Sequence, residues 1–60
     1  MGEKLRSARE AAGMTQAQLA EKVGVQQRDI SRWENCHREP GVLIVKAMAQ
    51  ALGCSMDSLV

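Results

Sequence analysis

The 60-residue sequence is poor in aromatic residues, because it has no Phe or Tyr and its one Trp is Trp33. Any core must therefore be aliphatic, built from Leu, Val, Ile, Met and Ala. A chain this short cannot bury two cores, so we expect residues 1–60 to form a single domain. No apolar run approaches the roughly 20 residues of a membrane-spanning helix. We therefore expect no membrane partner.

The sequence also lacks an excess of either charge, since eight Lys and Arg residues and seven Asp and Glu residues leave a formal net charge of +1. Bulk charge does not indicate a nucleic-acid partner, and only the placement of charge can do so. Cysteines are few as well. Cys36 and Cys54 could form one disulfide, but no secretory segment precedes them, and we expect a cytoplasmic chain that keeps them reduced.

Catalytic and metal-binding residues are scarce. The single histidine, His37, lies beside Cys36, and these two residues with Cys54 raise the question of a metal site or a thiol nucleophile. Their spacing matches no zinc pattern, and three ligands without a fourth make a poor structural site. We therefore expect no metal, no cofactor and no enzymatic activity.

What the sequence does contain is apolar residues at helical spacing, in segments separated by single glycines. These segments predict helices over about 2–12, 16–22, 27–35 and 42–52, with a final turn capped by Ser55. The run "TQAQ" reads as a capping box, in which Thr15 and Gln18 bond each other's backbone amides. The run "VLIV" could instead form a strand, but a single strand has no partner here. We expect an all-α bundle of about five short helices, with Val42 on the inward face of the last long one.

The predicted helix over 27–35 has two different faces. Ile30 and Trp33 lie on one arc, and Glu34 lies near them, which is unusual for a carboxylate. The opposite arc holds Gln27, Arg28, Ser31 and Arg32. Gln can make two hydrogen bonds to adenine and Arg can make two to guanine, so this arc could read DNA. The alternative is an ordinary solvated face, which every amphipathic helix has.

The short connection Gly24–Gln26 suits two short helices that cross steeply. Together with "TQAQLA", "VGV", "QQRDIS", "RWEN", "REP" and "LGCSMDSL", it resembles the helix-turn-helix of the phage repressor and Cro family (XRE-like). The resemblance runs from Leu5 to Leu59. It implies a lambda repressor-like fold and a sequence-specific transcriptional regulator that binds a palindromic DNA operator as a two-fold homodimer. An antitoxin, or another protein-binding module with this fold, is the alternative. A long disordered tail would favour it, and this chain has none.

The resemblance also implies roles for individual residues, because the second helix of the motif lies in the major groove and the first crosses the backbone. The implied base-reading residues are Gln26, Gln27, Arg28 and Arg32. The implied phosphate-binding residues are Gln16, Ser31, Asn35, His37 and Arg38. The resemblance further pairs Arg9 with Glu34 in a structural ion pair.

The sequence departs from the family pattern at several positions. Cys36 stands where glycine often follows "EN", so either Cys36 adopts a strained left-handed conformation or Asn35 does. Gln26 occupies a position where a short hydroxyl cap is usual, and Gly41 replaces a serine cap. Leu43 and Ile44 fall where relatives are often polar, and they form either an apolar patch for self-association or extra core.

Overall fold

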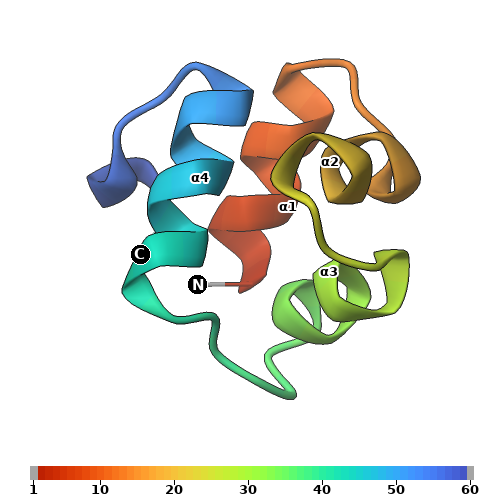
Figure 1. The fold of residues 1–60 in the computed structure, drawn as a ribbon. Coiled ribbons are helices and arrows are strands. Elements are labelled where there is room, and N and C mark those ends of the chain that lie inside the picture. The colour runs from red at the N-terminus through yellow and green to blue at the C-terminus, as the bar shows by residue number, and fades with distance from the viewer. Residues whose placement is uncertain (1, 60) are drawn as a thin grey trace.

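The computed structural model describes residues 2–59, which form four α-helices and one short 3-10 helix with no strand among them. The helices are α1 (Gly2–Ala11), α2 (Gln16–Val23), α3 (Gln27–Glu34), α4 (Val42–Leu52) and the 3-10 helix η1 (Met56–Ser58). Figure 1 shows α3 at the lower right of the molecule, below α2, with α1 in the middle and α4 on the left. The predicted all-α fold is confirmed. None of these helices is long and apolar enough to cross a membrane.

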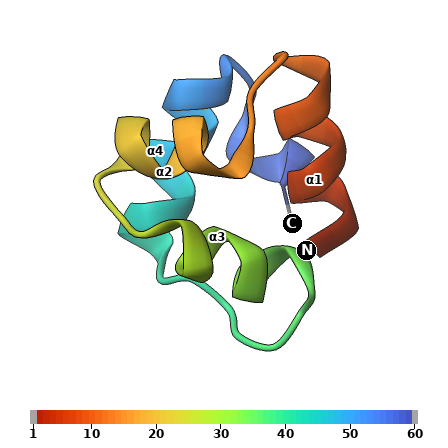
Figure 2. The same ribbon diagram turned by 90° about the vertical axis from the view of Figure 1, so that its right-hand side faces the viewer.

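The core lies where the four helices meet and is entirely aliphatic. Its largest fully buried side chains come from every helix and from the residue after η1, and they are Leu5, Leu19, Ile30, Met48 and Leu59. Ala20, Val45 and Ala49 complete the buried set, and Trp33 packs against it while remaining partly exposed. Because α2 packs on both α3 and α4, and α1 packs on α3 and η1, this small core fixes the direction of α3 (Figure 2).

The helix-turn-helix depends on a left-handed glycine. Gly24 has φ +85° and ψ +28°, a conformation that glycine adopts without steric cost. The amides of Gly24 and Val25 both donate to the carbonyl oxygen of Ala20, at 2.8 and 3.0 Å. These bonds end α2 and turn the chain within three residues, so that α3 begins at a steep angle to α2.

Cys36 takes the left-handed conformation at the end of α3. It has φ +60°, whereas Asn35 has φ −89°. The amide of Cys36 donates to Trp33 and the amide of His37 donates to Arg32, at 3.2 and 2.9 Å, which is the Schellman pattern. Of the two alternatives, Cys36 therefore bears the strain that glycine would avoid.

The two helices of the motif begin with different caps. At α2 the predicted capping box is confirmed, because the Gln18 amide donates to the Thr15 hydroxyl at 3.1 Å and the Thr15 amide donates to the Gln18 side chain at 2.9 Å. At α3 the Gln26 amide donates to the Asp29 carboxylate at 3.2 Å. A carboxylate in the first turn also favours the positive end of the helix.

The first turn of α4 differs from the prediction. Val42 was expected to face the core, but it is 72% exposed. Ile44 packs against the core instead, while Leu43 is 80% exposed. Val42 is the first residue of α4, and because helical side chains tilt toward the N-terminus, its side chain is directed past the end of the helix. Of the two readings of Leu43 and Ile44, Leu43 forms exposed apolar surface and Ile44 extends the core.

Candidate nucleic-acid interface

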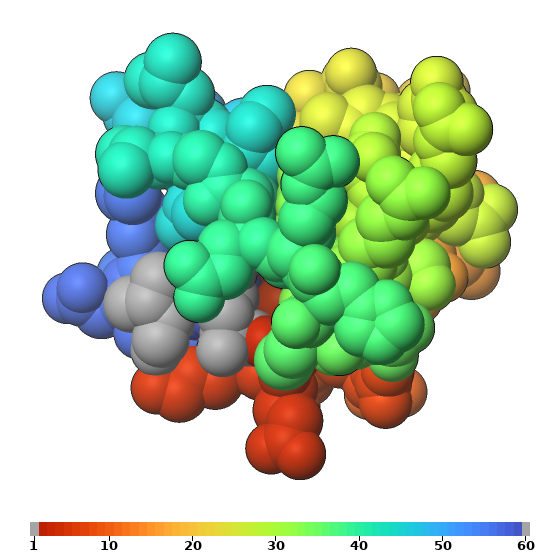
Figure 3. Space-filling view, turned by 90° about the horizontal axis from the view of Figure 1, so that it is seen from below, coloured from red at the N-terminus to blue at the C-terminus, as the bar shows by residue number. Residues whose placement is uncertain are grey.

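The solvent face of α3 carries long polar side chains. Gln27, Arg28 and Arg32 are exposed, Ser31 is half-buried, and Gln26 is exposed at the start of the helix. Figure 3 looks onto this face, with α3 beside the loop that follows it and the first turn of α4 next to that loop. Since Ile30 is fully buried on the opposite side, α3 cannot rotate to hide these groups. They form a fixed row of hydrogen-bond donors.

The loop that leaves α3 extends this row. Asn35, His37 and Arg38 are all exposed and follow directly from the end of the helix. The Nδ2 atom of Asn35 lies 3.4 Å from the hydroxyl of Ser31, one turn earlier. The structure therefore brings Asn35 together with Ser31, two of the residues predicted to bind phosphate, while His37 and Arg38 follow in the same exposed loop.

Glu34, the last residue of α3, carries a buried carboxylate. The side chain of Glu34 is 0% exposed, and Arg9 donates to it from Nε at 2.6 Å and from Nη2 at 3.2 Å. Arg9 also donates from Nη1 to the carbonyl oxygen of Met14, at 2.8 Å. The Arg9 guanidinium thus binds both the C-terminal end of α3 and the loop between α1 and α2. Such a two-pronged contact is the strong form of this ion pair.

The pKa of Glu34 reflects opposing influences. Burial is the largest and by itself raises this pKa, because it disfavours the charged form. Hydrogen bonds from Arg9, Gln16 and Arg6, together with the positive charge of Arg9, outweigh burial and hold the pKa below its ordinary value. The pKa of Arg9 is raised, chiefly by its hydrogen bond to Glu34. Both groups are therefore charged at neutral pH.

Gln16 belongs to this cluster as well as to the surface. Its Nε2 atom donates to Glu34 Oε1 at 3.1 Å, and the residue is half-buried. A carboxylate only accepts hydrogen bonds, so the contact fixes the orientation of the Gln16 amide. One Nε2 hydrogen is then used inside the protein, and the second remains for a ligand at the start of α2.

Arg6 is the residue of this cluster that the sequence reasoning missed. Its Nε donates to Glu34 Oε1 at 3.4 Å and its Nη2 donates to Asn35 Oδ1 at 3.2 Å. The signal was available in the sequence, since Arg6 and Arg9 are three residues apart and so share one face of a helix. Only the packing of α1 on α3 shows what that face contacts.

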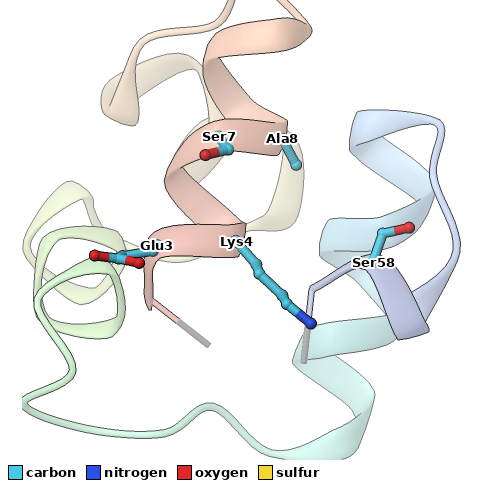
Figure 4. A pocket seen from close by; sticks show the side chains of 5 residues that line it. All are labelled: Glu3, Lys4, Ser7, Ala8 and Ser58. Atoms are coloured by element: carbon cyan, nitrogen blue, oxygen red, sulfur yellow. The ribbon is translucent and has the colours of Figure 1, made fainter.

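Other parts of the described chain offer less. A shallow hollow lies between α1 and the segment containing η1, lined by Glu3, Lys4, Ser7, Ala8 and Ser58, with α3 on the other side of α1 (Figure 4). Cys36 and Cys54 are both free thiols. Within residues 2–59, no three His, Cys, Asp or Glu side chains are grouped so as to hold a metal ion.

Comparison with known proteins assigns the family. The helix-turn-helix family pattern matches residues 5–59. Repressor protein C2 of Salmonella phage P22 is 41% identical over 59 residues, which cover 98% of this chain and 27% of that protein. The chain belongs to the phage repressor type of helix-turn-helix family. It spans about a quarter of the length of this curated relative.

Two solved structures have the same fold as this chain. The P22 c2 repressor, crystallised in complex with synthetic operator 9T, has a TM-score of 0.92 and 39% identity, with 98% of this chain and 89% of that chain covered. The restriction-modification controller protein C.AhdI of Aeromonas hydrophila has the same TM-score with 27% identity and the same coverage. The resemblance noted in the sequence is thereby confirmed for the fold and the family.

Proposed function

We propose that this chain is a DNA-binding repressor domain that reads an operator sequence with α3 in the major groove. The observation that carries the proposal is the likeness to the P22 c2 repressor solved with operator DNA, combined with the exposed polar face of α3. A helix fits the major groove, and there the four base pairs present distinct hydrogen-bond patterns. The proposal involves no catalysis, metal or cofactor, and it places the protein in the cytoplasm.

The base-reading role falls to the residues of α3 that are both exposed and multi-donor. We assign it to Gln26, Gln27, Arg28 and Arg32. The N-terminal half of a recognition helix usually contacts the bases. Gln26 and Gln27 stand there with Arg28, and Arg32 follows one turn later.

The phosphate-binding role falls to groups on both sides of α3. At the start of α2, Gln16 keeps one Nε2 hydrogen beside amides that carry the positive end of the helix dipole. After α3, the assigned residues are Asn35, His37 and Arg38, with Ser31 beside Asn35. Contacts on two sides would set the depth and angle at which α3 enters the groove.

We further propose that two copies bind a palindromic operator as a two-fold dimer and meet through the first turn of α4. Val42 and Leu43 are 72% and 80% exposed, and the first turn of α4, to which they belong, lies next to the loop that follows α3 (Figure 3). Pairing through this turn would direct both α3 helices toward one side of the dimer. The two half-sites would then lie about 34 Å apart, one turn of DNA.

The test is selection of binding sites from random DNA, followed by affinity measurements with single variants. Gln27→Ala and Arg28→Ala should each lose discrimination at one base position, by about 1–3 kcal/mol. Arg38→Ala should instead weaken binding to every sequence and reduce the slope of log affinity against log salt by about 0.9. Leu43→Ser should leave half-site preference unchanged and remove the preference for paired half-sites.

Two results would refute the proposal. One is the failure of the wild-type chain to enrich any sequence above the random pool. The other is an equal loss on all DNA for Gln27→Ala, Arg28→Ala and Arg38→Ala, which would mean that α3 does not read bases.

A further inference from the structure

We propose that Arg6 is a positioning residue, which holds the side-chain amide of Asn35 in the orientation that can bind a DNA phosphate. The inference rests on the proposed DNA-binding function and extends it to α1, an element outside the helix-turn-helix. It starts from one contact, the 3.2 Å hydrogen bond from Arg6 Nη2 to Asn35 Oδ1.

An asparagine amide has one accepting atom and one donating atom, and rotation by 180° exchanges them. A phosphate oxygen only accepts hydrogen bonds, so Asn35 can bind it only through Nδ2. Arg6 has no acceptor and can contact only Oδ1. Its hydrogen bond therefore selects the orientation in which Nδ2 is directed away from Arg6, toward Ser31 Oγ at 3.4 Å and the exposed face of α3.

Arg6 is itself held in place by Glu34. Its Nε donates to Glu34 Oε1 at 3.4 Å, and the Glu34 carboxylate is fully buried and fixed by Arg9. A guanidinium is planar, so a fixed Nε also limits where its Nη2 can lie. Asn35 directly follows Glu34, and a single arginine thus links the buried carboxylate to the first exposed residue beyond α3.

The same cluster reaches the other side of the proposed interface. Gln16, at the start of α2, donates to the same oxygen of Glu34 that accepts from Arg6. The two proposed phosphate-binding residues are therefore both linked to Glu34 Oε1, Gln16 directly and Asn35 through Arg6. Arg6 is about half exposed, with a side-chain exposure of 48%, so it can be substituted without opening the core.

The test uses Arg6→Lys, which keeps the positive charge but cannot contact Glu34 and Asn35 with one planar fork. Affinity for the selected operator and for unrelated DNA is measured in the wild-type background and in Asn35→Ala. Arg6→Lys should weaken binding about fivefold to tenfold on both DNAs, with an unchanged salt slope. In the Asn35→Ala background it should change affinity less than about twofold. Lys22→Arg is the matched control, and it should have little effect because Lys22 is exposed in the last turn of α2, outside the proposed interface, and the charge is kept.

A DNA-free measurement separates this inference from the proposed function. In the NMR spectrum of the free protein, Arg6→Lys should shift and broaden the two Nδ2 proton signals of Asn35, and Lys22→Arg should leave them unchanged. An equal loss of affinity with and without Asn35 would overturn the positioning role, as would unchanged Asn35 signals. A wild-type chain that binds no DNA but shows the Asn35 shift would refute the proposed function alone.

Discussion

Replacing Arg9 with methionine tests the energetic role of the buried ion pair. Methionine retains much of the side-chain volume but none of the three hydrogen bonds that the guanidinium donates to Glu34 and Met14. Breaking a buried pair by removing one partner costs about 3–5 kcal/mol, since the other charge is left without compensation. Gln16 and Arg6 still donate to Glu34, so we expect the lower end, about 3 kcal/mol. For a domain of this size that lowers the melting temperature by about 12–24 °C.

The same substitution should also change how the free energy of unfolding depends on pH. The folded-state pKa of Glu34 is depressed, so its contribution to stability is fully present above the unfolded pKa near 4.3 and is lost as the pH falls through the folded pKa. In Arg9→Met the burial effect has fewer opposing contacts, and the pKa of Glu34 should rise. The gap in unfolding free energy between wild type and variant should therefore shrink as the pH falls from 7 toward about 4.

Urea unfolding, followed by the fluorescence of Trp33, the one tryptophan, measures both the loss of stability at pH 7 and its change with pH. Because a 60-residue domain has only about 3–9 kcal/mol of stability, Arg9→Met could be largely unfolded. The double variant Arg9→Met with Glu34→Gln covers that case and should be more stable than Arg9→Met alone. Arg38→Met is the control and should stay within about 0.5 kcal/mol of wild type. If Arg9→Met behaved like this control, the ion pair would have no structural role.

Two further substitutions test the backbone around the end of α3. Cys36→Gly should stabilise the fold by about 1 kcal/mol in thermal unfolding, because a non-glycine residue at φ +60° is strained; Cys36→Ala keeps the strain, and equal stability of the two variants would contradict this explanation. Gly2→Ala should destabilise it by about 2 kcal/mol, since an added Cβ would overlap the carbonyl oxygen of Glu34 and lie 2.7 Å from Cys36 Sγ. Cys36→Gly should not rescue Gly2→Ala, because the overlap with backbone remains, and a full rescue would show that the thiol alone causes the clash.

Local features of this protein could be predicted from the sequence because they depend on residues a few positions apart. The capping box of Thr15 and Gln18 lies within one turn, and the left-handed Gly24 ends a helix whose apolar spacing is visible. The exposed row on α3 follows from helical geometry once Ile30 is assigned to the core. The predicted helix bounds accordingly agree with the structure to within one or two residues.

The roles of side chains at the ends of helices were not predictable in this way, because they depend on which neighbour covers them. Glu34 and Gln27 lie at similar angles around α3, yet Glu34 is buried against Arg6 and Arg9 of α1, whereas Gln27 is exposed. Val42 has the correct spacing for the core, but as the first residue of α4 it remains mostly exposed.

By itself, the sequence determined the positions of the four α-helices, the capping box of α2, the aliphatic core and the outward polar face of α3, all of which arise from helical periodicity and local hydrogen bonding. The family resemblance implied the pair of Arg9 with Glu34, and only the tertiary structure showed that Arg6 and Gln16 donate to the same carboxylate. These residues are separated from Glu34 by 18 to 28 positions along the chain. They come into contact only because α1 and α2 pack against α3, and this packing cannot be inferred from the spacing of residues along the chain.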